Sequence, residues 1–537
     1  MRGKRKHMGS NMGHATTPPP RIPRNGALIS CFSPVTIPRT QLNCSLLFLS
    51  SCDQAEILCC ALRAVPMAVI CELVGTIGTG PGWSWSDLPG DLLESVLARL
   101  PVPDRFRFPA VCTAWWSAAS ALHPRAVPVP SPWLMLPFDL TARRRRGGGT
   151  SSEEARFLSL SDGRTYTVPQ PAPAISDRLC VGSSPDGWLV TADAASELHL
   201  LNPLTGAQVP LPPPDTLSFV HASRDADGHV VSYSLRCCFA DDDGDEGATV
   251  IVPPESFAPD RLRYEFYEKA ILVSAPREGH TAAPGSGGSW GGYAVMLICQ
   301  PLSRIAIARA GDTRWTLLDT PSRRWSDAVR ASSTASAGGR QLVYAMDSAG
   351  RVEAWDVDVT ADTTPTRKAI AQPCCCCSGR ACSMSAACSR YLVELSPGRL
   401  LQVHRLRDAA HARCTWEPRP EQVEYTTVAA EFFELVGGQW APVDSRNGRA
   451  SILAGRALFL GKNASLCVPV DDCPELRGNC VYFTDDGPWS HERCREVAPD
   501  VGVLDLADGS YRPPRGAARD LLWKWPPPVW VFPSCAD

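Results

Sequence analysis

One short segment of this 537-residue chain constrains its fold more than any other: residues 85–123, WSDLPGDLLESVLARLPVPDRFRFPAVCTAWWSAASALH. Pro89 fits the first turn of a helix, where a missing N–H costs nothing, and apolar residues then recur at helical spacing. Pro101 and Pro103 end this helix, and a third apolar stripe begins at Val111. About 40 residues cannot bury a self-sufficient core, so the segment predicts a three-helix module that docks on a partner.

The order of residue types in this segment resembles the F-box: Leu-Pro, then L-L-x-x-V-L-x-x-L, then P-x-D-R, then V-C-x-x-W. In that family the motif binds the Skp adaptor of SCF-type ubiquitin ligases, and through it the cullin scaffold. The resemblance implies adaptor contacts at Leu88, Pro89, Leu92, Leu93, Val96, Leu100, Pro103, Val111, Cys112 and Trp116. Pro109 departs from the family pattern and is expected to shorten the second helix. The alternative is an ordinary helical hairpin of a larger domain.

The composition is that of a soluble globular protein with roughly two to four structural units. Apolar residues make up 44% of the chain and the net charge is −3, so nothing favours nucleic acid as a partner. Proline (49 residues) and glycine (41) are frequent, which favours turns and short strands. The 23 cysteines indicate reduced thiols, because the chain far exceeds the small secreted domains that need disulfides and shows no secretory signal.

Residues 1–82 are expected to be a disordered extension. Their apolar stretch, 57–77, is interrupted by Arg63, Pro66 and Glu72, so it lacks the run of about 20 apolar residues that crosses a membrane. The basic start MRGKRKH is compatible with a nuclear signal, although such runs are common in solvated tails, and a transit peptide is an alternative. We therefore expect no membrane partner and a location in the cytosol, the nucleus or both.

From about residue 128 onward, short apolar runs alternate with turn signals. Residues 341–347 and 350–357 form one such pair around a glycine turn, and similar pairs occur within 187–206, 390–404 and 480–506. Each pair reads as a strand, a tight turn and a second strand. The pairs recur at intervals of roughly 40 to 60 residues, which is the range of propeller blades. The pattern predicts an all-β propeller, with a pair of β-sandwiches as the alternative.

Two stretches of this β-rich part are similar to the plant KIB-type β-propeller. DGWLVTADAASELHLLNPLTGAQVPLPP, residues 186–213, carries the family's "L-x-N-P-x-T/S-G". ALFLGKNASLCVPVDDCPELRGNCVYFTDD, residues 457–486, carries "F-L-G-x-N-x-S" with Gly461, Asn463 and Ser465, followed by "N-C-I/V-Y-F-T-D-D". Many plant members carry an N-terminal F-box, so the two resemblances imply one architecture over most of the chain.

The sequence contains no convincing catalytic, metal or cofactor site. The run Cys374–Cys377 has no second ligand pair, and Asp241–Glu246 has only half the spacing of a calcium loop. Asp485 and Asp486 are adjacent on a predicted strand and point to opposite faces, so a turn or strand-end role is preferred. Arg143–Arg146 has no interleaved aromatic residues and predicts a solvated loop.

These observations predict five segments: an extension over 1–82, an F-box over 83–124, a linker over 125–155, a propeller over 156–515 and a C-terminal tail over 516–537. The first functional hypothesis is a non-catalytic substrate receptor of an SCF-type ubiquitin ligase, in which the propeller binds an unknown target protein. The second is an F-box and propeller interaction protein that acts outside ubiquitin ligation. A propeller enzyme is a third class, but the ten histidines are scattered and form no cluster in the sequence.

Overall fold

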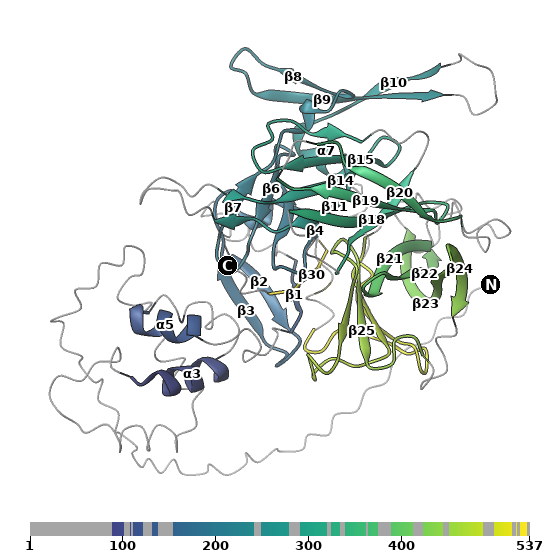
Figure 1. The fold of residues 1–537 in the computed structure, drawn as a ribbon. Coiled ribbons are helices and arrows are strands. Elements are labelled where there is room, and N and C mark those ends of the chain that lie inside the picture. Colours follow the sequence, from purple (N-terminus) through teal and green to yellow (C-terminus); the bar gives the residue numbers. More distant parts are fainter. Residues whose placement is uncertain are drawn as a thin grey trace, which may run out of the picture. The chain divides into compact units, whose positions relative to one another are not determined.

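The computed structural model describes most of the chain downstream of residue 87. The ranges are 88–100, 108, 111–121, 131–137, 154–240, 249–278, 290–318, 324–332, 339–360, 363–373, 388–411, 423–443, 451–486, 499–517, 522 and 527–533. The extension predicted over residues 1–82 lies outside them. Figure 1 follows the described part from its first helix to the last strand.

The helical module consists of α3 (Gly90–Arg99) and α5 (Thr113–Ala121). The carbonyl of Pro89 accepts two hydrogen bonds from the first turn of α3, both at 3.1 Å, as predicted for a helix that starts here. At the other end Leu100 is extended (φ −67°, ψ 143°), the conformation that a following proline imposes. The helix predicted between the two lies outside the described residues except for Phe108.

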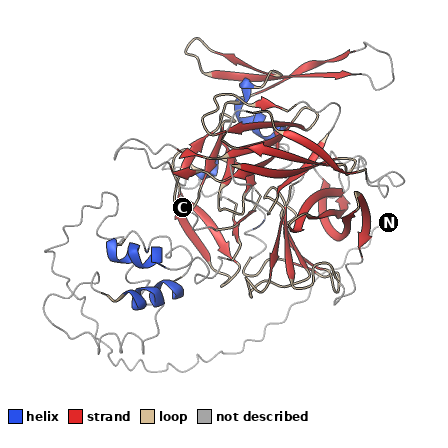
Figure 2. Cartoon of the chain, in the orientation of Figure 1, coloured by secondary structure: helices blue, strands red, loops and turns tan. Residues whose placement is uncertain are grey.

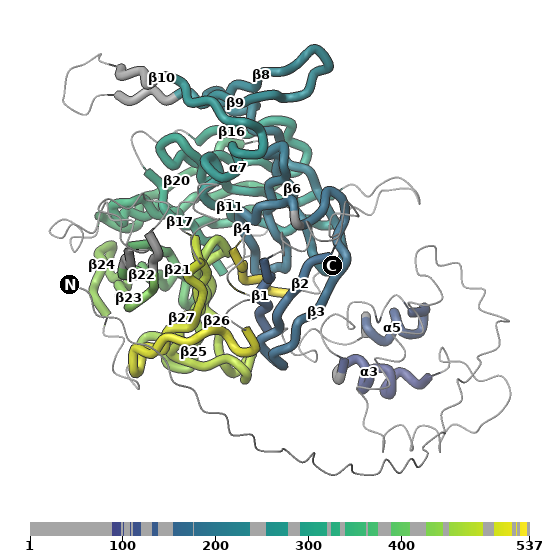
Figure 3. Tube along the Cα trace, turned by 180° about the vertical axis from the view of Figure 1, so that it is seen from behind, coloured from purple at the N-terminus to yellow at the C-terminus, as the bar shows by residue number. Residues whose placement is uncertain are grey.

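A small apolar core lies between α3 and α5. It is built from the buried side chains of Leu88, Leu93, Leu97, Leu100, Phe108, Trp115 and Ala118. The rings of Phe108 and Trp115 lie with their centroids 4.4 Å apart, so the residue between the helices helps to join them. No helix within the described ranges combines the length and apolarity that a membrane crossing requires. Figure 2 colours the helices of the chain blue and its strands red, and Figure 3 shows the same chain from behind.

Six sheets of four or five strands follow in the described chain, and we call them blades 1 to 6. Blade 1 has the order β3-β2-β1-β30, with β1 Trp133–Met135, β2 Glu154–Ser159, β3 Thr165–Pro169 and β30 Val529–Val531. Blade 2 is β4 Leu179–Ser183, β5 Leu189–Ala192, β6 Leu198–Leu201 and β7 Gln208–Pro210. Blade 3 is β11 Tyr267–Ser274, β14 Ala294–Cys299, β15 Arg304–Arg309 and β16 Thr316–Leu317.

Blade 4 is β17 Trp325–Arg330, β18 Arg340–Asp347, β19 Val352–Asp358 and β20 Thr366–Ala371. Blade 5 is β21 Cys388–Ser396, β22 Arg399–His411, β23 Val423–Val436 and β24 Gln439–Val443. Blade 6 has the order β26-β25-β27-β28-β29, with β25 Arg456–Leu460, β26 Leu466–Pro469, β27 Cys480–Phe483, β28 Gly502–Asp505 and β29 Tyr511–Arg512. Strand pairs within the blades are antiparallel except β25 with β27.

Apolar clusters join each blade to the next and the last blade to the first. Successive clusters contain residues of blades 1 and 2, 2 and 3, 3 and 4, 4 and 5, 5 and 6, and finally 6 and 1. The alternation of side chains along a strand makes this possible. In β1, Trp133 and Met135 pack towards blade 2, whereas Leu134 packs towards blade 6. Six sheets joined in a closed cycle are a six-bladed β-propeller, which confirms the predicted fold class.

Ring closure depends on the C-terminal strand β30. It pairs with β1 in blade 1, so the two ends of the propeller share one sheet. Trp530 is fully buried between blades 1 and 6, with its ring edge-on to Phe459 at 5.1 Å. Its carbonyl accepts a hydrogen bond of 2.6 Å from the hydroxyl of Ser183 in blade 2. One strand therefore contacts both neighbours of its own blade.

A three-stranded sheet, a helix and a 3-10 turn lie on the connection between blades 2 and 3. The three-stranded sheet, β8 (Val220–Arg224), β9 (Val230–Ala240) and β10 (Thr249–Phe257), projects beyond the blades in Figure 1. Helix α7 (Pro259–Phe266) leads from it into blade 3, and β12 (Arg277–Glu278) pairs with β13 (Trp290–Gly291). Short 3-10 turns span Ile175–Asp177 and Pro214–Thr216.

The structure extends the propeller beyond the predicted 156–515 at both ends. The predicted linker 125–155 contains β1 and the start of β2, and the predicted tail 516–537 contains β30. β1 and β30 are each only three residues long, and they pair with each other from opposite ends of the propeller. Such a pairing leaves no local hairpin signal, so sequence periodicity assigned these residues to connecting segments.

Replacement of Trp530 by alanine should open a cavity at the closure between blades 1 and 6. We expect Trp530→Ala to lower the free energy of unfolding by about 3–5 kcal/mol, the usual cost of deleting a buried tryptophan. Urea denaturation followed by near-UV circular dichroism would measure it. Trp116→Ala is the matched control, since Trp116 is 61% exposed and belongs to the helical module. Equal losses in the two variants would contradict the closure described above.

Candidate adaptor-docking module and charged interior of the propeller

The ten predicted adaptor-binding residues differ in how accessible they are. Leu88, Leu93 and Leu100 are buried in the module itself, with 7%, 1% and 1% of their surface exposed. A partner cannot touch these three directly while the module keeps this conformation, so they act by holding the two helices together. Leu92, Val96, Val111 and Cys112 are half-buried, Pro89 and Trp116 are exposed, and Pro103 lies outside the described residues.

Trp116 is the most exposed large apolar side chain of the described chain, at 61%. It directly follows Trp115, which is 2% exposed and packs on Phe108. Adjacent positions on a helix point about 100° apart, so the pair separates into one residue for the core and one for the surface. Exposed tryptophan is enriched at protein interfaces, which makes this face of α5 the best docking candidate of the module.

A second candidate site lies inside the propeller, where charged side chains are buried. Lys269 of β11 pairs with Asp327 of β17 across 2.6 Å, and the two side chains are 8% and 1% exposed. The second carboxylate oxygen of Asp327 accepts hydrogen bonds from the N–H of Leu392 at 2.9 Å and the hydroxyl of Ser465 at 3.0 Å. These partners come from blades 3, 5 and 6. One buried carboxylate of blade 4 thus joins four blades.

A second ionic group joins blades 5 and 6. Arg405 of β22 is 1% exposed, pairs with Asp500 at 2.8 Å and donates to the carbonyl of Thr484 at 2.7 Å. Its guanidinium lies 4.2 Å from the ring centre of Phe483. A carboxylate oxygen of Asp486 lies 3.6 Å from a terminal nitrogen of the same guanidinium. Burial alone would raise the pKa of Asp486, but Arg405 and the neighbouring Arg407 lower it below its ordinary value. Arginine holds its proton, so this group supplies fixed charge rather than proton transfer.

The segment after β25, residues 461–465, touches the inner strands of several blades, and we call it the inner loop. The ammonium of Lys462 donates to the carbonyl of Glu268 in blade 3. The N–H of Ala464 donates to the carbonyl of Ser183 in blade 2 at 2.8 Å. Together with the bond from Ser465 to Asp327, the loop contacts blades 2, 3 and 4 while belonging to blade 6.

Gly461 allows the inner loop to turn. Its φ of 147° lies in a region that residues with a Cβ rarely adopt, and a Cβ there would lie 2.2 Å from the hydroxyl oxygen of Thr484. Asn463 is completely buried, and its amide donates to the carbonyl of Ala464 at 2.8 Å. The residues shared with the "F-L-G-x-N-x-S" pattern, Gly461, Asn463 and Ser465, are therefore those that shape this loop and attach it to Asp327.

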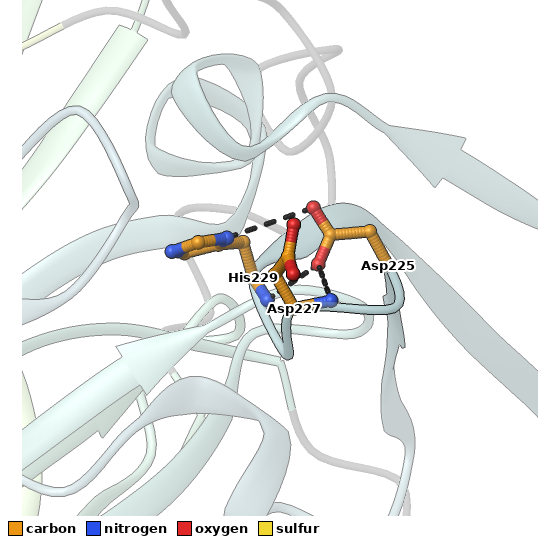
Figure 4. Close-up of side chains that lie close together, drawn as sticks. All are labelled: Asp225, Asp227 and His229. Atoms are coloured by element: carbon orange, nitrogen blue, oxygen red, sulfur yellow. Dashed lines mark hydrogen bonds and ion pairs between the residues drawn. The ribbon is translucent and has the colours of Figure 1, made fainter.

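An exposed group at the turn between β8 and β9 has the residue types of a metal site. Figure 4 shows Asp225, Asp227 and His229 side by side. Asp225 already accepts backbone N–H groups of Asp227 at 3.0 Å and His229 at 2.8 Å, and it lies 3.6 Å from the His229 ring. These contacts are those of an aspartate that stabilises a hairpin turn, which explains the cluster without an ion.

The other sequence features weighed for chemistry lie outside the described residues: Arg143–Arg146, Asp241–Glu246 and Cys374–Cys377. Two of the four buried cysteines of the described chain, Cys180 and Cys299, lie in strands of blades 2 and 3. Burial raises the pKa of the Cys180 thiol to about 12 and that of the Cys299 thiol well above its ordinary value. Both thiols stay protonated at neutral pH, so they are poor nucleophiles and poor metal ligands.

A helical module followed by a six-bladed propeller is the architecture expected of an F-box protein with a β-propeller domain, and two family models agree with it. The family model described as KIB1-4 beta-propeller matches residues 157–505, and that of the F-box domain matches residues 85–120. The first match covers well over half of the chain, and the chain belongs to the KIB1-4 β-propeller family.

Curated relatives in Arabidopsis thaliana agree with this assignment. The F-box protein At3g56470 is 34% identical over 127 residues, 24% of this chain and 30% of the relative. The F-box/kelch-repeat protein At1g57790 is 33% identical over 129 residues, 24% of this chain and 32% of the relative. The F-box protein KIB2 is 27% identical over 124 residues, 23% of this chain and 26% of the relative. The matched segments thus span about a third or less of each relative.

Sequence reasoning did not foresee the charged interior. Asp485 and Asp486 were expected at a turn or strand end, and both do follow the last residue of β27. Their roles depend on Arg405 and Arg407, which are far away in the sequence. One signal was available in LQVHRLR, residues 401–407: Arg405 follows Leu401 and Val403 on the face of the strand that is expected to be buried.

Removal of the charge at Asp327 should leave Lys269 buried without a counter-ion. We expect Asp327→Asn to lower the free energy of unfolding by at least about 3 kcal/mol, the usual cost of breaking a buried ion pair. The double variant Lys269→Met/Asp327→Asn should recover about 1 kcal/mol or more of this loss, measured by urea denaturation. Strictly additive losses would show that the pair does not interact.

Gly461→Ala should destabilise the propeller through the inner loop. Backbone strain at this φ and overlap with Thr484 together should lower the free energy of unfolding by about 3 kcal/mol. Gly206→Ala is the control, because Gly206 also has positive φ (75°) but has open space where the Cβ would lie. The control should lose only about 1–2 kcal/mol in the same urea titration. Similar losses at the two glycines would argue against a steric role for Gly461.

Proposed function

We propose that this protein is the substrate-recognition subunit of an SCF-type ubiquitin ligase. The observation that carries the proposal is the presence of an F-box and a β-propeller in one chain, supported by relatives that are F-box proteins. The F-box would bind the Skp adaptor, and the adaptor would connect the protein to the cullin scaffold. Cytosol and nucleus are the compartments in which we place this activity.

The accessible residues of the module would form the adaptor contact. Trp116 offers an exposed aromatic anchor on α5, and Pro89 is exposed at the start of α3. The half-buried Leu92 and Val96 would extend the apolar patch along α3. Partner binding would cover this surface, which a module of this size leaves in water.

The propeller would hold a target protein, and the proposed mechanism is proximity. Tethering the target raises the effective concentration of its lysines at the ubiquitin thioester carried by the conjugating enzyme. In this mechanism the chain itself forms no covalent bond and is not an enzyme. The buried ion pairs of Asp327 and Arg405 support such a role, because they fix the blades that position the binding surface.

Capture of the Skp adaptor by the purified full-length chain tests this proposal. Wild type should bind the adaptor, and Pro89→Ala/Trp116→Ala should weaken binding roughly 30-fold, since loss of an interface tryptophan typically costs 2 kcal/mol or more. Surface plasmon resonance would give both affinities. Leu88→Ala is a poor choice here, because Leu88 belongs to the core of the module.

Ser117→Ala is the matched control, because Ser117 is the exposed neighbour of Trp116 on the same helix. It should bind like wild type, and circular dichroism should show that all three proteins are folded. A folded wild type that captures no Skp adaptor would overturn the ligase proposal. It would favour a propeller interaction protein that acts outside ubiquitin ligation.

A further inference from the structure

Lysine is scarce in this chain, and arginine carries almost all of its positive charge. The six lysines of the sequence are Lys4, Lys6, Lys269, Lys368, Lys462 and Lys524. Lysine and arginine together number 53, so 47 residues are arginine (53 minus six). A lysine amine can lose its proton and attack a carbonyl carbon, whereas an arginine guanidinium keeps its proton in proteins. The positions of these few lysines therefore decide where an acyl group can be transferred to a side-chain amine of the chain.

Three of the lysines lie in the described part of the chain, and two of these three are engaged inside the propeller. Lys269 is buried and pairs with Asp327. Lys462 belongs to the inner loop, and its ammonium donates to the carbonyl of Glu268. An enzyme that carries an acyl group as a thioester is itself folded, so the accepting amine has to reach out of the propeller to meet it. Neither of these two amines can do so while the blades keep the positions described above.

Lys368 differs from both of these lysines. It lies on β20, the outermost strand of blade 4, and its side chain is exposed. Its ammonium has neither a carboxylate partner nor a hydrogen-bond acceptor among the described residues. In the part of the chain that the structure describes, Lys368 is therefore the one lysine whose amine is free to approach another protein.

The preceding residue shows how the same strand restrains a cation on its other face. Arg367 pairs with Glu353 at 3.2 Å, and its guanidinium lies 5.7 Å from the ring centre of Trp355. Successive side chains of a strand point to opposite faces, so Lys368 is directed away from these partners. In the register of β19 and β20, Lys368 lies opposite Ala354, and an alanine offers no charge that would hold the amine.

The backbone that carries Lys368 is anchored. β20 pairs with β19 from its first residue to its last. Beyond its end, the N–H of Gln372 donates to the carbonyl of Gly438, in the turn between β23 and β24 of blade 5, at 3.0 Å. A lysine amine sits on a flexible four-carbon side chain. The amine of Lys368 thus has a defined place at the outer edge of blade 4 and can still turn towards an approaching carbonyl group.

We propose that Lys368 is a ubiquitin acceptor of this chain, modified by the ligase in which the chain serves as receptor. The uncharged amine of Lys368 attacks the thioester carbonyl of ubiquitin on the conjugating enzyme, so that a C–N bond forms and the C–S bond breaks. The sulfur leaves with the electron pair of the broken bond and takes up the proton that the amine loses. The proposal rests on the ligase function proposed above and adds the site at which the receptor itself is modified.

The scarcity of lysine limits this reaction to few positions. Tethering in a ligase raises the effective concentration of the receptor's own lysines at the thioester, as it does for the lysines of a bound target. Exposed arginines supply charge and solubility without accepting ubiquitin. Within the described part of the propeller, self-modification is thus confined to the outer edge of blade 4.

The test reconstitutes ubiquitin transfer with the full-length chain, the Skp adaptor, the remaining subunits of an SCF-type ligase, the activating and conjugating enzymes, ubiquitin and ATP. The parent variant is Lys4→Arg/Lys6→Arg/Lys524→Arg, because these three lysines lie outside the described residues. Mass spectrometry of its tryptic peptides should find the diglycine remnant of ubiquitin on Lys368. Addition of Lys368→Arg to this variant should abolish lysine-linked self-modification, although both lysines inside the propeller remain. Arginine is the matched replacement, because it keeps the positive charge.

Remnants on Lys269 or Lys462 in place of Lys368 would overturn the proposal, as would self-modification that is unchanged by Lys368→Arg. An assembly that contains the adaptor and leaves Lys368 unmodified would overturn it too, while the ligase function stands. Pro89→Ala/Trp116→Ala should lower the remnant at Lys368 together with adaptor binding. A remnant that persists in this variant would show transfer without docking and refute self-modification. Adaptor capture is measured separately by surface plasmon resonance, and its failure in wild type would end the ligase proposal and this inference with it.

Discussion

The carboxylate of Asp327 is the contact on which the inner rim of the propeller depends. It neutralises Lys269 of blade 3, accepts an N–H from blade 5 and accepts the hydroxyl of Ser465 from blade 6. Apolar contacts between blades are non-directional and permit small rotations, whereas these bonds require a fixed geometry. The inner loop, shaped by Gly461, then extends the same group of contacts to blade 2. Directional polar bonds at the centre thus fix the relative positions of blades that hydrophobic packing holds together at their faces.

Alternate side chains of one strand pack on different neighbouring blades, which explains how short strands suffice to build the ring. In β1 and β30, alternate side chains face opposite neighbours, so a strand of three residues contributes to two apolar clusters. Trp530 faces blade 6, and the flanking Val529 and Val531 face blade 2. Every blade is buried on both faces in this way, which is why these strands are apolar at successive positions instead of alternating with polar residues.

The sequence predicted the pairing of neighbouring strands and few of the contacts between distant segments. Hairpins such as β18–β19 were predictable, because both strands and the turn at Gly350 lie within twenty residues. β1 and β30 were not, because each derives its register from a strand at the other end of the propeller. Asp327 gave no sign of its role, since none of its partners from other blades is a sequence neighbour. The resemblance to the F-box likewise implied ten adaptor contacts, but only packing separates buried Leu93 from exposed Trp116.

The position of β30 has a consequence for the synthesis of the protein. A ribosome releases the helical module before the propeller, and the strand that completes blade 1 emerges after the other described strands. Before β30 is made, the other five blades can form, but one edge of β1 lacks its partner strand. The apolar residues of blades 1 and 6 that later cover Trp530 stay exposed to water. A chain cut before residue 527 retains the helical module without a closed ring. The propeller can therefore close only after translation has passed the end of β30.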